Sequence, residues 1–391
     1  MTLVADPPAQ RLVARATALV PMLRTQAEAA EKARRVPPAT FEALSEAGVF
    51  RMTAPRKYGG DEADFQTQCD VLAEIARGCP STSWVATIFS AMSWAAGVFP
   101  DEAQEEVFDG GDPRISGVFS PTGTAVPMDG GFVVNGRWPF NTGCDGARWT
   151  IVNAVLGHGP GAGMPMCVLT KSRDLKIHDD WHASGMSATG SKTIVAENVF
   201  VPSHRVQSLV DMLQAKYPPR HNAANRYFQY PLAPVLSVNA GGTPVGIARG
   251  ALEAFHERLP GRGITYTNYT NKTDAAVTHL QVGEAVLKID SADAHVRLAT
   301  AMLDAYPYDM LTAKARVKSR AHIAYATGLA REAVDLLFYS SGASAIQSQV
   351  PIQRFQRDIQ ALANHAIMHP ATNVETYGRV LCGLEPNTLL V

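Results

Sequence analysis

The order of apolar and polar residues divides the chain into three segments. Residues 1–112 carry apolar residues at helical spacing, as at Phe41 and Leu44, where Pro38 suits a helix start and Gly48 a helix end. Residues 113–222 are rich in Gly, Pro, Val, Thr and Asn and lose this spacing, which predicts strands and turns. Residues 223–391 return to long amphipathic patterns with short loops, which predicts an antiparallel helix bundle.

A long uncharged stretch at residues 80–100 lies near the end of the first segment. Its mostly apolar part, 84–99, is shorter than the ~20 residues that a helix needs to cross a bilayer. We therefore predict a helix that is buried on all sides by other helices, with Ser81 as its N-cap.

Turn signals and apolar runs outline the middle segment. Asp129-Gly130-Gly131 separates two apolar runs and predicts a hairpin, and Asn135-Gly136 is a second signal of the same kind. Residues 166–170 and 193–201 are further runs that are typical of strands. The segment is therefore expected to be a small all-β domain.

Apolar residues of the last segment recur every seven positions at Leu280, Leu287 and Ala294, and residues 329–336 carry another apolar face. Charges of both signs are balanced in this segment. We expect these faces to be buried within the bundle and against other subunits.

Composition excludes several classes of protein. Thirty-five basic and thirty-six acidic residues give a net charge of −1, so the positive excess of a nucleic-acid-binding protein is missing. The five cysteines are scattered without metal-ligand spacing, which favours a reducing compartment over a disulfide framework or a zinc site. The first residues show no signal-peptide pattern. We expect a cytoplasmic protein with no membrane or nucleic-acid partner.

Two clusters carry candidate chemistry, while the common nucleotide-binding, zinc-protease and hydrolase motifs are missing. Residues 138–149 place Asn141, Thr142 and Gly143 between two tryptophans, a combination that suits a planar heteroaromatic ligand such as a flavin. A tryptophan-rich core with a polar turn is the alternative. His365 and His369 would share a helix face if the helix continued that far. Because no third ligand has the right spacing, we expect no metal, and the choice between a general base and a helix-end histidine stays open.

Four motifs, in the same order, resemble the acyl-CoA dehydrogenase superfamily over nearly the whole chain. They are an early Tyr-Gly-Gly turn, a hairpin, a strand that closes the β domain and an Arg-Asp segment, at residues 56–60, 129–143, 197–206 and 351–359. The resemblance implies an α+β fold with an N-terminal helical domain, a middle β-barrel or sandwich domain and a C-terminal four-helix bundle. It also implies a homotetramer with flavin between the β domain and the bundle, partly touching a neighbouring subunit.

The carboxylate that defines an acyl-CoA dehydrogenase is missing from both positions where the family places it, since residues 231–252 and 359–370 contain neither Asp nor Glu. What remains, residues 81–84, 138–143 and His365, resembles the oxygenase components of two-component flavin-dependent aromatic monooxygenases. This resemblance implies reduced FMN or FAD from a separate NAD(P)H-dependent reductase, O₂ as co-substrate, a C4a-hydroperoxyflavin and hydroxylation of a phenolic, polycyclic or indole-type ring. It implies no metal.

The same resemblance gives each candidate residue a role. Thr142 matches the hydroxyl residue that contacts flavin N5, and Asn141 stands where many relatives carry serine. His365 is expected to be the base that withdraws a substrate proton, and Ser120 to hydrogen-bond the substrate. Trp84 and Phe119 are expected to wall the ring-binding pocket, and the remaining expected flavin contacts are Trp138, Gly143, Thr189, Gly190, Ser191 and Arg262, the last at the flavin phosphate.

Three other functions stay open at this point. They are oxygenation of nitrogen or sulfur by the same fold, a divergent acyl-CoA dehydrogenase or oxidase with a relocated base, and an inactive scaffold. Tightly held, stoichiometric flavin would favour the dehydrogenase, whereas weakly held flavin would favour the two-component oxygenase.

Overall fold

Prolines start several of the N-terminal helices, because the missing N–H costs nothing in the first turn. The computed structural model describes residues 8–305 and 311–391. Its N-terminal part consists of α1 (Pro8–Ala33), α2 (Pro38–Glu46), α3 (Phe65–Gly78), α4 (Pro80–Ala96) and α5 (Asp101–Phe108).

Helix α4 is the buried helix predicted from the uncharged stretch, and nearly all of its side chains are buried. Cys79, and not Ser81, is its N-cap, because Pro80 occupies the first turn and moves the helix start forward. Across the described residues, no helix combines the length and the apolar character of a membrane span.

The middle part is the expected all-β domain, a seven-stranded sheet in the order β5-β6-β2-β1-β3-β4-β7. Only β1 and β3 pair in parallel, and the other neighbours are antiparallel. The strands are β1 (Ile115–Met128), β2 (Gly131–Asn141), β3 (Trp149–Leu156), β4 (Pro165–Lys171), β5 (Lys176–His178), β6 (Lys192–Pro202) and β7 (Val206–Ser208).

One of the two predicted hairpin turns is present. Met128 pairs with Gly131 across the turn, and Gly130 adopts a φ of +77°. The second prediction is wrong, since Asn135-Gly136 lies inside β2, next to a bulge. The glycine is needed there for packing, because a Cβ at Gly136 would lie 2.5 Å from the indole of Trp138.

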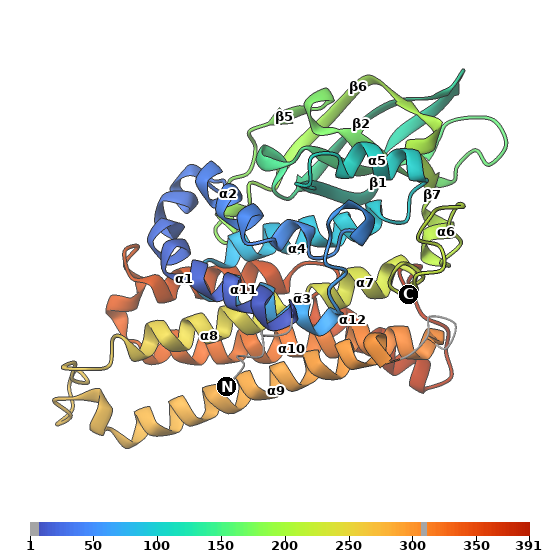
Figure 1. The fold of residues 1–391 in the computed structure, drawn as a ribbon. Coiled ribbons are helices and arrows are strands. Elements are labelled where there is room, and N and C mark those ends of the chain that lie inside the picture. Colours follow the sequence, from blue (N-terminus) through green and yellow to red (C-terminus); the bar gives the residue numbers. More distant parts are fainter. Residues whose placement is uncertain (1–7, 306–310) are drawn as a thin grey trace, which may run out of the picture.

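Four helices form the C-terminal bundle: α8 (Gly242–His256), α9 (Ala276–Ala305), α10 (Ala313–Ser340) and α11 (Pro351–Ala363). Helices α8, α9 and α10 lie on the side of the N-terminal helices away from the sheet (Figure 1), whereas α11 contacts the loop before β6. Helix α3 packs closely on α8, since a Cβ at Gly242 would lie 2.0 Å from the carbonyl oxygen of Cys69. The shorter helices are α6 (Leu209–Leu213), α7 (Leu232–Asn239) and α12 (Pro370–Leu381).

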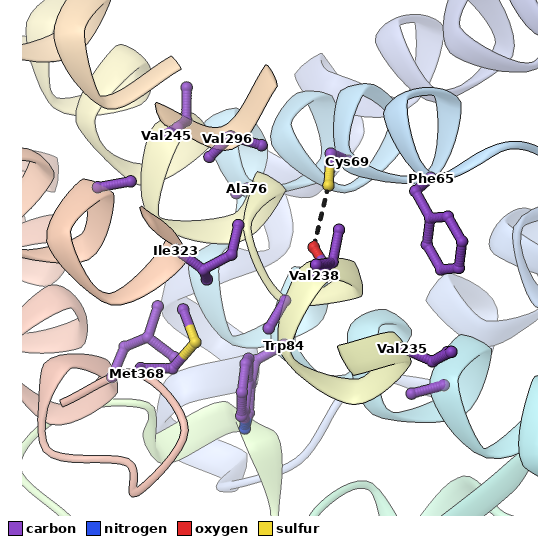
Figure 2. Packing of buried hydrophobic residues seen from close by; sticks show 14 of the residues in the cluster. Phe65, Cys69, Ala76, Trp84, Val235, Val238, Val245, Val296, Ile323 and Met368 are labelled. Atoms are coloured by element: carbon purple, nitrogen blue, oxygen red, sulfur yellow. Dashed lines mark hydrogen bonds between the residues drawn. The ribbon is translucent and has the colours of Figure 1, made fainter. Parts of the chain in front are cut away.

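The core runs continuously from these helices to the sheet. Figure 2 shows part of it, including the Cys69 thiol, which donates a 3.2 Å hydrogen bond to the carbonyl of Val238 and joins α3 to α7. The same buried cluster holds Trp84 of α4 and Met368 of the loop after α11 (Figure 2). The helix at the centre of the molecule therefore touches the loop that carries the candidate histidine.

Two expectations for the bundle need correction or qualification. Helix α11 ends at Ala363 and His369 is the N-cap of α12, so His365 and His369 do not share a helix face. The heptad residues Leu280 and Leu287 point out of the bundle, with 75% and 68% of their surface exposed. The inward face of α9 is instead made of smaller residues such as Ala285 and Ala292.

Candidate active site

Three loops meet the N-terminal half of α4, and they carry most of the predicted site residues. The indole of Trp84 meets the ring of His365 edge-on, at 5.0 Å between centroids. One turn earlier, the Ser81 hydroxyl contacts the sulfur of Met186 at 3.8 Å, in the loop before β6. Helix α4 therefore contacts both His365 and the loop before β6, and it determines how far apart they lie.

The loop after β2 lies directly on the same helix. Gly143 has a φ of +73°, and a Cβ there would lie 2.8 Å from both Val85 and Phe89. Its N–H donates a 2.9 Å hydrogen bond to the carbonyl of Thr189. A side chain at position 143 would push this loop away from α4, so glycine is required for the observed approach.

Three hydroxyl groups form a chain whose direction is determined by its last acceptor. The Thr189 hydroxyl donates to the carbonyl of Met186 at 2.7 Å, so it accepts from Ser191 at 2.7 Å. Ser191 has then used its proton, and it accepts from Thr142 at 2.9 Å. The oxygen of Thr142 is left with lone pairs only, so it can accept a further hydrogen bond but cannot donate one.

Asn141 precedes this threonine and is fully buried, and neither its amide nitrogen nor its amide oxygen has a hydrogen-bond partner within the described residues. Leaving both groups unpaired costs several kcal/mol at about 1–3 kcal/mol per group. An amide donor and acceptor beside a hydroxyl acceptor fit the N5 and C4-carbonyl edge of a flavin, which offers the complementary groups. The residues present therefore fit the cofactor that the sequence led us to expect.

His365 is an exposed residue overall, while protein atoms surround its imidazole ring, which meets the Trp84 indole. Burial, with a smaller contribution from the positive charge of Arg320, lowers the pKa of its imidazole to about 4. The ring is therefore neutral at pH 7 and can accept a proton from a donor placed beside Trp84.

An open pocket of about 460 Å³ adjoins the His365 loop. Its lining includes Asn364 and His369 from the loop and Asn387 and Thr388 from the C-terminal tail. Asn387 accepts a 2.8 Å hydrogen bond from Thr376 of α12, which holds the tail against the cavity.

The remaining candidate residues of the β domain do not all lie beside Asn141 and Thr142. Phe119 is half-buried in an irregular part of β1 and Ser120 is exposed beside it. Trp138 lies in the interior of the sheet domain, fully buried, and donates a 2.7 Å hydrogen bond to the carbonyl of Asn153. Its indole N–H is therefore already satisfied inside the sheet domain. Gly190 adopts a φ of +53° at the end of the Thr189 turn.

Arg262 lies in a separate basic cluster beyond the end of α8. Arg258 and Arg262 both donate to the Ser344 hydroxyl, at 3.0 and 2.9 Å, and Lys272 donates to the carbonyl of Ser340 at 2.9 Å. Within the described residues, none of these three cations forms an ion pair with a carboxylate. Burial and the neighbouring arginines lower the pKa of Lys272. The cluster is therefore suited to an anion, and it lies far from the sheet (Figure 1).

Sequence reasoning missed two residues of the site. Asp358 is buried and accepts the N–H of Met186 at 2.5 Å, and only its place in the Arg-Asp motif singled it out. Phe140 is 68% exposed with a φ of +63°, and its ring faces that of Trp181 at 5.8 Å. No group of three or more metal-ligating side chains was found in the part of the chain that the structure describes.

Comparison with known proteins places the chain among flavoenzymes. Residues 11–108 match the N-terminal domain model of acyl-CoA dehydrogenases, and residues 239–370 match the C-terminal one. The chain is 32% identical to the oxygenase component of an FADH₂-dependent resorcinol hydroxylase from a Rhizobium species, over 97% of this chain and 96% of the relative. It is 34% identical to the oxygenase subunit HsaA of a flavin-dependent monooxygenase from Rhodococcus jostii, over 95% and 98%.

Solved structures agree with these relatives. The 3-HSA hydroxylase from Rhodococcus sp. RHA1 superposes with a TM-score of 0.88 at 32% identity, over 97% of this chain and 99% of the other. XiaF from a Streptomyces species, solved with FADH₂ and glycerol, superposes with a TM-score of 0.89 at 31% identity, over 97% of each chain.

Proposed function

Because the chain belongs to the acyl-CoA dehydrogenase family, among its flavin-dependent monooxygenases, we propose that it is the oxygenase component of a two-component aromatic hydroxylase. Its substrate is a phenol or another electron-rich ring, its cofactor is reduced flavin and its co-substrate is O₂. The relatives named above support the reaction class, and p-hydroxyphenylacetate 3-hydroxylase of Acinetobacter baumannii, 27% identical, is another of them.

The observation that carries the proposal is the set of unused hydrogen-bonding groups at Asn141 and Thr142. Both residues are buried, the amide has no partner among the described residues, and the hydroxyl can only accept. Reduced flavin carries a proton on N5, so this N–H can donate to the Thr142 hydroxyl oxygen, which has no other donor in the described part of the chain. The Asn141 amide pairs with the neighbouring carbonyl edge of the flavin. A dehydrogenase would instead need a carboxylate beside its substrate, and the residues after Asp358 provide none up to Pro370.

The chain's own residues prepare the substrate. Bound reduced flavin supplies the electrons with which O₂ is activated. The neutral imidazole of His365 accepts the proton of a phenol or indole, which raises the electron density of the ring at the moment of oxygen transfer. Trp84 holds the imidazole edge-on and excludes water from one side of the ring.

A separate NAD(P)H-dependent reductase is part of the proposal, because the motifs of a dinucleotide-binding domain are missing from the sequence. A cytoplasmic location is also part of it, and the five free cysteines, four of them buried, support a reducing compartment.

Rapid mixing of the protein and anaerobically reduced FMN or FAD with oxygenated buffer tests the proposal. Flavin reoxidation should proceed through a transient absorbing species, and with an added phenol the reaction should yield hydroxylated product in place of hydrogen peroxide. Reoxidation without a transient, together with anaerobic bleaching of oxidised flavin by an acyl-CoA, would instead identify a dehydrogenase.

The basic cluster gives a first prediction. Arg262→Ala is expected to weaken FAD binding about tenfold, because a charge-assisted hydrogen bond to phosphate contributes about 1.5–3 kcal/mol. Binding is measured by titration calorimetry, with riboflavin as the control ligand because it carries no phosphate. An equal loss of riboflavin affinity would contradict a phosphate contact.

A homotetramer is also proposed, and the exposed apolar stripe of α9 supports it. Val277, Leu280, Leu287 and Leu298 are each at least 46% exposed along one helix. Since the loop after α8 lies far from the sheet within one chain (Figure 1), a neighbouring copy would bring the basic cluster to the flavin. A second copy of this chain is thus the expected occupant of the stripe.

The second prediction follows from this stripe. Leu280→Lys combined with Leu287→Lys is expected to shift the protein to smaller species in sedimentation experiments and to weaken FAD binding at the same time. Met128→Lys is the matched control, since Met128 is 51% exposed at the β1–β2 turn, away from α9. An unchanged sedimentation coefficient of the double variant would remove the stripe from the subunit interface.

A further inference from the structure

Asp358 is a buried carboxyl group to which the proposed reaction assigns no role. It lies on α11, is 2% exposed, and forms no ion pair among the described residues. Its surroundings are charged, because Arg354 and Arg357 on the same helix both pair with Glu31 of α1. Burial raises the pKa of Asp358 to about 7, and the carboxylate of Glu31 adds to this effect. A structure that needed only packing here would have used an apolar side chain.

Among the described residues, the Asp358 carboxyl accepts one hydrogen bond from the sheet domain, from the Met186 N–H at 2.5 Å. Met186 adopts a left-handed conformation with a φ of +53°, which side chains with a Cβ rarely take. Its carbonyl accepts from the Thr189 hydroxyl at 2.7 Å and from the Trp181 indole at 3.2 Å. Both polar groups of this strained residue are therefore fixed by hydrogen bonds.

The bundle approaches this loop very closely. A Cβ at Gly185 would lie 2.1 Å from the carbonyl oxygen of Arg357, and the Arg357 guanidinium donates to the carbonyl of Ser184 at 2.5 Å. Residues 184 and 185 are thus held against α11 by Arg357, the residue that precedes Asp358. A change at Asp358 is transmitted to Met186 directly, without any intervening side chain.

We propose that Asp358 is a positioning residue for the flavin site. By holding the Met186 peptide, it orients the carbonyl that accepts the last hydrogen bond of the hydroxyl chain that begins at Thr142. With Met186 fixed, the protons of Thr142, Ser191 and Thr189 all point away from the cofactor side. With Met186 released, Thr189 loses its acceptor and the chain can reverse, which turns Thr142 into a donor. This inference rests on the proposed function, because it assigns the chain's free end to reduced flavin.

Asp358→Ala and Asp358→Asn separate positioning from simple packing. Asparagine keeps an oxygen that accepts the Met186 N–H, whereas alanine does not. In ligand-free protein, we expect amide hydrogen exchange at residues 184–191 to be at least tenfold faster in Asp358→Ala and within threefold of the unmodified protein in Asp358→Asn. Asp335→Asn is the matched control, since Asp335 accepts from Gln360 on α11 at 2.7 Å and, among the described residues, forms no hydrogen bond with the sheet domain.

Flavin binding gives the second readout. Asp358→Ala is expected to lose at least tenfold in the ratio of reduced-flavin to oxidised-flavin affinity, and Asp358→Asn is expected to restore it. If alanine leaves the protein unfolded, Asp358→Leu fills the volume without an acceptor and is expected to show the same losses. Unchanged exchange in the alanine or leucine variant, or an asparagine variant as impaired as these, would overturn the proposal. If exchange responds as expected but no form binds reduced flavin, the proposed function fails and the contact between Asp358 and Met186 stands.

Discussion

His365→Ala is expected to reduce the rate of aromatic hydroxylation by about 10²–10⁴-fold, the range that a positioned general base contributes. Reduced flavin should still react with O₂, so the oxygen consumed should appear as hydrogen peroxide. The measurement is the ratio of hydroxylated product to peroxide at saturating flavin. The physical reason is that the neutral imidazole beside Trp84 is the proton acceptor that this pocket offers to a phenol.

The pH profile provides a second test of the same residue. Because burial lowers the pKa of His365 to about 4, the imidazole is unprotonated between pH 6 and 8, and its protonation should not limit the rate there. The rate should fall only as the pH drops through about 4, where the ring gains a proton and can no longer accept one. His369→Ala is the control, because the His369 side chain caps α12 by accepting the N–H of Thr372. If His369→Ala lost as much product as His365→Ala, the base would be wrongly assigned.

Hydrophobic patterning predicted the arrangement of the fold because each domain buries a different kind of face. The uncharged stretch became α4, which has neighbours on every side, and the Asp129-Gly130 turn formed because the following run pairs back on β1. The resemblance to acyl-CoA dehydrogenases is confirmed by the family models and by the superposed structures. These features depend on local sequence or on a long ordered set of motifs, so the sequence was sufficient for them.

The wrong predictions arose where tertiary packing decided the local structure. Asn135-Gly136 reads as a turn, yet the glycine is there to accommodate the Trp138 indole inside the sheet. His365 and His369 have helical spacing, but α11 ends before them. Neither outcome depends on neighbouring residues alone, so no local pattern could have predicted them.

The candidate site was predicted in part. The loop residues Thr142 and Gly143 and the turn residues Thr189 and Ser191 come together as expected, because the motifs mark the two loops on the same edge. The direction of the hydroxyl chain could not be read from sequence, since it follows from the Met186 carbonyl at its end. Asp358 was likewise missed, because its hydrogen bond to the loop is to a main-chain N–H, which no side-chain pattern marks.

The orientation of this chain leads to the second large effect. Thr142→Val is expected to weaken the binding of reduced flavin about tenfold or more while leaving the affinity for oxidised flavin nearly unchanged. A buried N–H left without an acceptor costs about 1–3 kcal/mol, and tenfold corresponds to about 1.4 kcal/mol. Oxidised flavin has no proton on N5 and loses nothing when an acceptor is removed. Anaerobic titration calorimetry with reduced and oxidised flavin measures both affinities.

Two further variants decide whether the redox preference belongs to Thr142. Thr142→Ser keeps the hydroxyl and should retain the preference, provided that Ser191 still accepts its proton. Asn141→Ala should weaken both redox forms alike, because an amide both donates and accepts and therefore suits either one. Equal losses for reduced and oxidised flavin in Thr142→Val would mean that the hydroxyl only packs against the cofactor. A preference that moved with Asn141 would place the N5 contact at the amide. Either result would mean that the hydroxyl chain does not determine the preference for reduced flavin, because the Thr142 oxygen would then not face N5.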